Sequence, residues 1–507
     1  MRGWLLAALW LAGCGGKDAR PPDDRVDREH GAQLPIDPAE PTAVTVPDFP
    51  EGTRSLELVH TTAVRLEPGD GKRIGTVAVD TRVGWVRTAK AKGCQKAWIE
   101  IRPRGWICGD YVKPSSKAPF GREVPMLDRA ELVPGVYGKV TAPNSVTFTV
   151  DKPKPAKDDR TSRKPKPKQH QGPITSPSDV VQLTLKPQPK LVEGRPLVGS
   201  VNVRQYEELA VDGKVYWRIS QKDPEYVLRQ AITPHRPSVY GGARLGDDTG
   251  WTGPTITAPA SAETIGFVWP RVVGWQQVYT TNKAIGGGVN RQLAARTPVA
   301  ILEISADKAG RPVAYRIGLA EWIAAADVRV FAAAPPPPLL EKGERWIDVD
   351  LDNQILVAFE GDTPVYSTMV SSGGKDTPTE IGVYRMWLKE SEADMKGLNG
   401  EDPYSVATVP WTQFFSPEKG LALHTAYWHD QFGARRSHGC VNLAPRDARW
   451  LYFWSDPQVP PGWTMAAGVI EAPGSIVRIR TKEEPSPEPR GYARKVIELR
   501  QQNAPVK

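Results

Sequence analysis

The chain has 507 residues, a formal net charge of +8 at pH 7 and a hydrophobic content of 40%. This length excludes a single compact domain, and three or four domains are the natural expectation. The hydrophobic content is ample for globular cores, while 49 prolines argue for loops and linkers rather than long helices.

The N-terminus has the pattern of an export signal. Arg2 precedes the apolar run Trp4–Leu11, and Leu-Ala-Gly stands directly before Cys14. This run is too short for a membrane-spanning helix, and no other stretch of the chain is long and apolar enough. Leu-Ala-Gly-Cys resembles a bacterial lipobox, which implies a signal peptide at residues 1–13 and lipidation of the Cys14 sulfur.

The same resemblance predicts where the protein resides. A lipidated Cys14 implies an anchor at the periplasmic face of the cell envelope, and Gly15 favours the outer membrane of a Gram-negative cell. The alternative is a plain secretory signal with an incidental cysteine. Residues 14–55 are rich in Pro, Asp and Arg without apolar periodicity, which indicates a disordered tether.

Residues 56–115 alternate apolar and polar side chains between frequent glycines, which predicts a small β-barrel. Cys94 and Cys108 lie on either side of an expected hairpin in this segment. In an exported protein we expect this pair to form a disulfide, which leaves Cys440 without a partner. The segment resembles a bacterial SH3-like module.

A faint internal repeat extends this pattern along the chain. The similar segments are Trp106–Val112, Tyr226–Ile232 and Trp322–Val328. Each follows an aromatic strand pattern, so we expect three consecutive β modules at 56–115, 119–240 and 241–331. The alternative is that aromatic-rich strands simply look alike.

A basic insertion, residues 151–174, interrupts the second module, and a Pro-rich linker, residues 332–342, follows the third. Lys152–Lys168 contains eight Lys or Arg against two Asp. Such a Pro-Lys run is extended and solvated, and it suits contact with anionic wall polymer or lipid headgroups as well as a plain linker. No aromatic residues interleave with the charges, which argues against nucleic-acid binding.

The densest group of chemistry-bearing side chains lies in the last fifth of the chain. His424, His429 and His438 fall within fifteen residues, and Cys440 follows. A cysteine becomes a good nucleophile when an imidazole takes its proton. Gly439 leaves room beside the sulfur, so a substrate carbonyl could approach backbone N–H groups.

Two other interpretations of these histidines and Cys440 are possible. Cys440 could be a buried structural thiol, although its Gly and His neighbours are unlike an apolar core site. The three histidines and Cys440 could instead bind zinc, but no second cysteine pair and no HExxH motif accompanies them. We therefore expect neither a metal nor another cofactor.

Ser437-His-Gly-Cys-Val-Asn442, with Leu-His424 upstream, resembles the signature of the L,D-transpeptidases, the YkuD-like cysteine enzymes of peptidoglycan. The resemblance continues in segments similar to the family's opening strands and its glycine-rich turn: Trp346–Leu356, Ser371–Gly374 and Thr377–Gly382. Thr425 stands where many members carry glycine, which leaves open what orients the histidine.

The resemblance implies a mainly β fold: a β-sandwich catalytic domain at 343–480 with a short helix after the nucleophile, preceded by SH3-like β-barrel modules. Apolar patterning predicts strands and a helix at Trp346–Leu351, Ile355–Phe359, Val365–Ser371, Ile381–Met386, Leu421–Leu423, Pro445–Trp454 (the helix) and Ser475–Arg480. Residues 481–507 form a charged C-terminal tail of unassigned structure.

The resemblance also implies roles for single residues. Cys440 is the nucleophile, His424 is its base, and the backbone N–H groups of Gly439 and Cys440 are candidates for an oxyanion hole. The residues expected to hold the loop or contact substrate are Thr425, Ser437, His438 and Asn442. Arg435 and Arg436 could bind a carboxylate of the stem peptide or remain solvated. His429 by itself is expected in a surface loop.

The implied reaction is attack on the bond between diaminopimelate and D-alanine of a peptidoglycan tetrapeptide stem. D-Alanine leaves, and the acyl group passes to a second stem, to a lysine of an outer-membrane lipoprotein, or to water in an L,D-carboxypeptidase or amidase reaction. The sequence does not choose among these acceptors. A different class of answer is a non-catalytic, lipid-anchored protein that binds the cell wall through its β modules.

Overall fold

The computed structural model describes residues 49–502, with gaps at 70, 129–130, 152–188, 247–254, 257–263, 339 and 398–402. The expected signal peptide, Cys14, most of the tether and most of the basic insertion lie outside the described residues. Within the described part of the chain, no helix is long and apolar enough to cross a membrane. The predicted fold class is confirmed, because strands dominate and only two α-helices are described.

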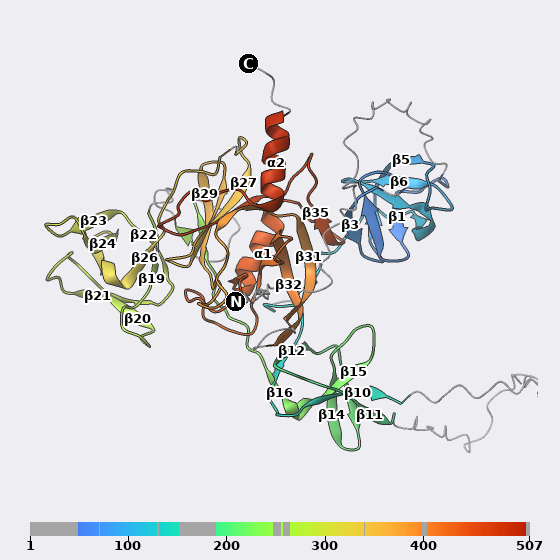
Figure 1. The fold of residues 1–507 in the computed structure, drawn as a ribbon, viewed down its shortest axis with the longest axis horizontal. Helices are drawn as coiled ribbons and strands as arrows, with labels where there is room; N and C mark the ends of the chain where they lie inside the picture. The colour runs from blue at the N-terminus through green and yellow to red at the C-terminus, as the bar shows by residue number, and fades with distance from the viewer. Residues whose placement is uncertain are drawn as a thin grey trace, which may run out of the picture. The chain divides into compact units, whose positions relative to one another are not determined.

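Three β modules share one strand topology, drawn in blue, green and yellow-green in Figure 1. Each combines a set of three paired strands with a set of five. The orders are β4-β1-β8 with β3-β2-β7-β6-β5, β16-β9-β12 with β11-β10-β15-β14-β13, and β22-β19-β26 with β21-β20-β25-β24-β23. Each of the three similar sequence segments forms a strand, a 3-10 turn and the start of the next strand. The faint repeat therefore reflects a repeated fold.

The first module contains β1 Ser55–Leu58, β2 Thr62–Arg65, β3 Arg73–Val77, β4 Arg82–Val83, β5 Trp85–Ala89, β6 Trp98–Ile101, β7 Trp106–Cys108 and β8 Val112–Ser115. The second contains β9 Tyr137–Val140, β10 Val146–Val150, β11 Leu191–Pro196, β12 Ser200–Arg204, β13 Glu207–Val211, β14 Lys214–Arg218, β15 Glu225–Leu228 and β16 Ile232–Pro234. The third contains β19 Ile265–Val268, β20 Gln277–Thr281, β21 Val289–Ala294, β22 Pro298–Ala300, β23 Glu303–Ala306, β24 Pro312–Gly318, β25 Glu321–Ala324 and β26 Val328–Val330.

A disulfide joins Cys94 to Cys108 in the first module, across a Cα–Cα distance of 5.5 Å. Cys108 packs with Trp98 and Trp106 in a small apolar cluster. The carboxylate of Asp110 accepts a hydrogen bond from the backbone N–H of Gln95, the residue after Cys94, at 2.8 Å. The disulfide therefore closes the hairpin where the sequence places the cysteine pair. Among the described residues, Cys440 is the cysteine outside any disulfide.

The C-terminal domain is a two-layer β structure. One helix follows the Ser437–Asn442 motif and precedes the last two strands. Its elements are β27 Arg345–Asp350, β28 Ile355–Glu360, β29 Thr363–Met369, β30 Gly382–Arg385, β31 Leu388–Gly397, β32 Tyr404–Ser416, β33 Leu421–Thr425, β34 Val441–Leu443, α1 Pro445–Trp454, β35 Trp463–Ala467 and β36 Ile476–Arg480. One sheet has the order β29-β28-β27-β36-β30, and β31 to β35 form the other.

The main core lies between these two sheets. Ile347 and Leu356 of the first sheet are buried with Trp411 and Leu423 of the second, and Leu451 of α1 joins them. Helix α1 starts with a proline in its first turn and an acidic residue two positions on, as a helix start prefers. The strands and the helix expected from apolar periodicity are all present, with ends that differ by a residue or two.

The Pro-rich linker is not a free spacer. Asp348, buried in β27, binds Arg478 at 2.6 Å and Arg480 at 2.9 Å, both from β36. The two guanidinium groups also donate to the backbone oxygens of Pro335 and Ala332. These bonds satisfy a buried charged group that would otherwise be costly, and they hold the linker against the C-terminal domain.

Two expected boundaries differ from the structure. β17 Ala243–Leu245 pairs with β29 and with the short strand β18 Thr255–Ile256, so this stretch extends the C-terminal sheet and the third module begins only at β19. The pairing partner lies more than a hundred residues away, so no local pattern reveals it. The tail contains α2 Gly491–Gln502. The segment before α2 is attached to β30, because Val383 N donates to Glu488 O and Val383 O accepts from Arg490 N.

The first module and the C-terminal domain share a sheet and a core, as Figure 1 shows for β3 beside β35. β3 pairs antiparallel with β35, with Gly75 opposite Ala466. A Cβ on Gly75 would lie 2.0 Å from the ring of Trp463, so only glycine permits this close contact. Leu56 and Ile74 belong to the same apolar cluster as Ile347.

We predict that Gly75→Ala lowers the free energy of unfolding by about 1–3 kcal/mol, because the added methyl group overpacks against the indole of Trp463. Gly84→Ala in the same module is the matched control, since its Cβ would meet only the flexible Arg102 side chain at 3.5 Å. Urea unfolding of residues 49–507 measures both. Equal stabilities for the two variants would contradict the contact.

Candidate active site

Two parallel strands position the histidine and the cysteine. β33 pairs with β34 so that Leu423 lies opposite Val441 and His424 opposite Asn442. Leu423 and Val441 face the main core, and alternation along each strand turns His424 and Cys440 to the other side. There Cys440 packs beside Ala422 in a smaller apolar cluster. The register therefore places the imidazole and the thiol on one face of the sheet.

The backbone carbonyl of Thr425 orients the ring of His424. Nδ1 of His424 lies 2.9 Å from this oxygen. A carbonyl only accepts, so Nδ1 carries the proton and Nε2 is left as the basic nitrogen. Burial lowers the pKa of His424 to about 4, because the cation loses its hydration. The Thr425 hydroxyl has no hydrogen-bond partner among the described residues, so its backbone rather than its side chain does the orienting.

The thiol is enclosed. Cys440 has no exposed surface, and its Sγ lies 4.0 Å from the backbone oxygen of Gly420. His438, two residues earlier, stacks on Tyr404 of β32 with ring centroids 4.5 Å apart. Tyr427, on the loop after β33, donates to the backbone oxygen of Ala407 in the same strand at 2.8 Å. The hairpin of β31 and β32 thus closes over the loop that carries the cysteine.

A glycine-rich turn holds the loop before the cysteine. The backbone of Ser371 exchanges two hydrogen bonds with that of Asn442, at 3.0 and 2.9 Å. Gly374 N donates to Ser437 O at 2.9 Å, and Thr379 Oγ1 donates to Gly439 O at 2.7 Å. The two upstream segments that resemble the family therefore form a cradle for the cysteine loop.

The Gly439 N–H, one of the candidates for an oxyanion hole, forms a hydrogen bond within its own turn. It donates to Ser437 Oγ at 3.1 Å, and Ser437 Oγ in turn donates to the backbone oxygen of Cys440. Gly439 has φ of +120°, a conformation that this internal bonding requires and glycine tolerates. In this structure Gly439 shapes the turn, and its N–H is engaged rather than directed at a substrate oxygen.

His429 differs from the expected surface-loop residue. Its Nε2 lies 3.0 Å from Asn442 Nδ2, and its Nδ1 accepts from Gln431 N at 3.1 Å. Burial lowers its pKa to about 4, and the nearby Arg436 adds to this effect. Asn442 stands opposite His424, so His429 supports the strand pair from the side. Sequence spacing gave no signal for this contact because the loop folds back on itself.

The two adjacent arginines have different surroundings. Arg435 donates to Leu351 O at 2.9 Å and lies 3.5 Å from the carboxylate of Asp352. Arg436 is exposed, and no carboxylate of the described residues pairs with it.

For the zinc alternative, the group of possible ligands found within the described ranges is Cys94, Cys108 and Asp110, two of which share the disulfide.

The C-terminal domain is thus a β-sandwich that carries a buried thiol and a buried imidazole on one face of its second sheet. Comparison with known proteins then gives the family: residues 344–479 match the YkuD model, described as the L,D-transpeptidase catalytic domain. The chain therefore contains an L,D-transpeptidase catalytic domain.

Parts of the chain are also similar to named proteins and to a solved structure. L,D-transpeptidase 1 of Mycobacterium tuberculosis is 26% identical over 227 residues, which cover 39% of this chain and 80% of that protein. The putative L,D-transpeptidase YciB of Bacillus subtilis is 26% identical over 127 residues, 23% of this chain and 63% of that protein. A crystal structure of Enterococcus faecium L,D-transpeptidase is 28% identical, with a TM-score of 0.23 over 28% of this chain and 51% of that one. The chain thus spans about half the length of that solved protein.

We predict that the free energy of unfolding falls between pH 6.5 and 4. In this window the unfolded chain binds protons at His424 and His429, whereas the folded chain does not, so stability is complete above the ordinary value of 6.5 and is lost on acidification. His429→Gln should make this pH slope shallower by up to about 1.4 kcal/mol per pH unit. Urea unfolding at stepped pH measures it, and His424→Gln should act alike. An unchanged slope in both variants would contradict the neutral, buried state.

Proposed function

We propose that this protein is a peptidoglycan L,D-transpeptidase with Cys440 as nucleophile and His424 as its base. The observation that carries the proposal is the shared face of β33 and β34. It holds a buried thiol and an imidazole whose Nδ1 is fixed on the Thr425 carbonyl. The family match of residues 344–479 supports the same assignment.

In the first step, Cys440 Sγ attacks the carbonyl of diaminopimelate at position three of the stem. Nε2 of His424 takes the thiol proton, and the carbonyl oxygen becomes an oxyanion. The intermediate collapses to a thioester, and the same proton passes to the nitrogen of the departing D-alanine. Because the pKa of His424 is about 4, the resting imidazole is neutral and ready to accept this proton.

In the second step, an amine attacks the thioester. His424 removes a proton from the amine and returns it to the sulfur, which regenerates the thiol. An amine of a second stem would give a 3–3 cross-link, and a lysine of an outer-membrane lipoprotein would give a wall anchor. Water at this stage would make the enzyme an L,D-carboxypeptidase or amidase.

The products identify the acceptor. Muropeptides incubated with residues 49–507 would yield cross-linked dimers with a stem acceptor, or tripeptides with water. The fragment should include the first module, because Leu56 and Ile74 are buried in the core of the catalytic domain. No change in the muropeptides would favour the non-catalytic, wall-binding alternative.

We predict that His424→Ala slows acylation almost as fully as Cys440→Ala, by about 10²–10⁴-fold, because removing either member of an activated pair loses most of its effect. His438→Ala should cost about tenfold or less through its lost stacking on Tyr404. His429→Ala should cost about fivefold through the lost contact with Asn442. Intact mass measurement of carbapenem attachment gives the rates. Normal acylation of His424→Ala together with none for His438→Ala would reverse the assignment.

We propose further that the protein is lipid-anchored at the periplasmic face of the cell envelope, most simply at the outer membrane. The motif Leu-Ala-Gly-Cys14 supports this, although Cys14 lies outside the described residues. Cys14→Ser should abolish incorporation of a labelled fatty acid and release the protein from the membrane fraction. Label retained on the Cys14→Ser protein would rule out this anchor.

A further inference from the structure

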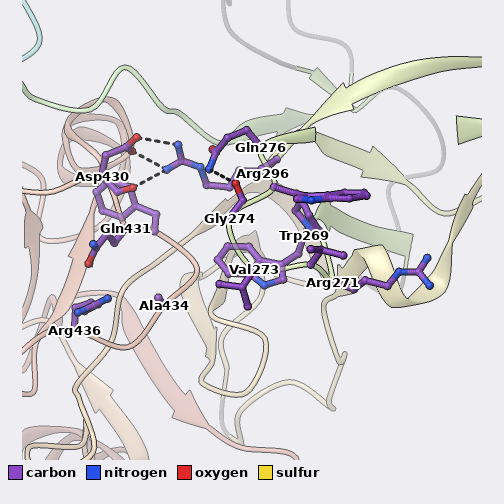
Figure 2. A pocket seen from close by; sticks show the side chains of 15 residues that line it. Trp269, Arg271, Val273, Gly274, Gln276, Arg296, Asp430, Gln431, Ala434 and Arg436 are labelled. Carbon is purple, nitrogen blue, oxygen red and sulfur yellow. Dashed lines mark hydrogen bonds and ion pairs between the residues drawn. The ribbon is translucent and has the colours of Figure 1, made fainter. Parts of the chain in front are cut away.

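A pocket of about 680 Å³ lies where the third module meets the loop that leads to the cysteine. Figure 2 shows Arg436 and Asp430 on one side and Trp269, Val273 and Arg271 on the other. One wall is thus the segment between β19 and β20, which the family model does not include. The volume is in the range of pockets that enclose small ligands.

The pocket has a built wall on the side of the third module. The ring of Trp269 packs so closely on Gly433 that a Cβ there would lie 2.1 Å from it. The guanidinium of Arg329 stacks on Trp269, 3.9 Å from the ring centroid, and also donates to Gly433 O. These contacts fix the loop before the cysteine against the third module.

Arg436 is the uncompensated charge of this pocket. Two other lining arginines are neutralised: Arg271 binds Asp327 at 2.6 Å, and Arg296 binds Asp430 at 2.6 Å. Arg436 has no carboxylate partner among the described residues and is exposed. An exposed guanidinium in a pocket whose other charges are paired is complementary to a carboxylate.

Arg436 is also anchored next to the reacting groups. Its backbone N–H donates to Ser372 O at 2.8 Å, in the cradle of the cysteine loop. Its charge helps to lower the pKa of His429, which bonds Asn442 opposite His424. Arg436 therefore joins the pocket lining to the segment that leads to the cysteine.

Apolar surface completes the pocket. In the third-module wall, Val273 is 99% exposed and Trp275 is 56% exposed. Val273 and Trp275 are neighbours in the chain segment that lines the pocket, so an aliphatic peptide chain bound there would cover both. The combination is one cationic anchor with an apolar flank.

We propose that this pocket binds the substrate stem peptide, with its C-terminal carboxylate on Arg436 and its aliphatic part against Val273 and Trp275. The third module then completes the substrate site rather than serving only as a spacer. Arg435, held by Leu351 O and Asp352, positions the loop and does not bind substrate. The inference rests on the proposed function for the identity of the peptide.

The test measures binding apart from turnover. In a Cys440→Ala background of residues 49–507, calorimetry gives the Kd of a tetrapeptide stem and of its C-terminal amide. Arg436→Gln should raise the Kd of the acid about tenfold and leave that of the amide nearly unchanged. Trp275→Ser should weaken both peptides to a similar degree. Arg311→Gln, an exposed third-module arginine paired with Asp307, is the charge-matched control and should change neither.

Each outcome decides the proposal. Equal weakening of acid and amide by Arg436→Gln, or no effect on either, overturns the carboxylate anchor. An unchanged Kd for Trp275→Ser overturns the role of the third module. Turnover of the tetrapeptide by the chain with its native cysteine is scored separately. Absent turnover with intact discrimination between acid and amide would count against the proposed function but not against the pocket.

Discussion

The parallel pairing of β33 with β34 is the contact on which the site depends. Because side chains alternate along a strand, the register that buries Leu423 and Val441 in the core turns His424 and Cys440 to the opposite face. A slip of one residue would send the imidazole or the thiol into the core. The apolar residues of the two strands therefore fix the geometry of the candidate site as well as the fold, and the crossover between them carries His429, Arg436 and His438.

Much of the C-terminal domain follows from local sequence. The strands of its first sheet and helix α1 are visible in apolar periodicity, because each is buried along a regular face. The pairing of Cys94 with Cys108 likewise follows from their position on one hairpin. The catalytic domain could be identified because the motif around Cys440 is specific, and the family match at residues 344–479 confirms the domain.

The features that sequence did not reveal all depend on distant partners. β17 pairs with β29, which is more than a hundred residues away, and the linker is held by arginines of β36. His429 contacts Asn442 only because its loop folds back, and Gly439 N–H is taken by Ser437 rather than left for substrate. Spacing along the chain reports which residues are present, whereas these contacts are set by the closure of the tertiary fold.

Burial gives the resting site its chemical state. A thiolate and an imidazolium would both lose hydration in the enclosed space beneath the β31–β32 hairpin, so burial favours the neutral pair. The lowered pKa of His424 is the same effect acting on the base. In the proposed reaction, charge separation becomes favourable only when a substrate carbonyl is present to accept the electron pair from sulfur.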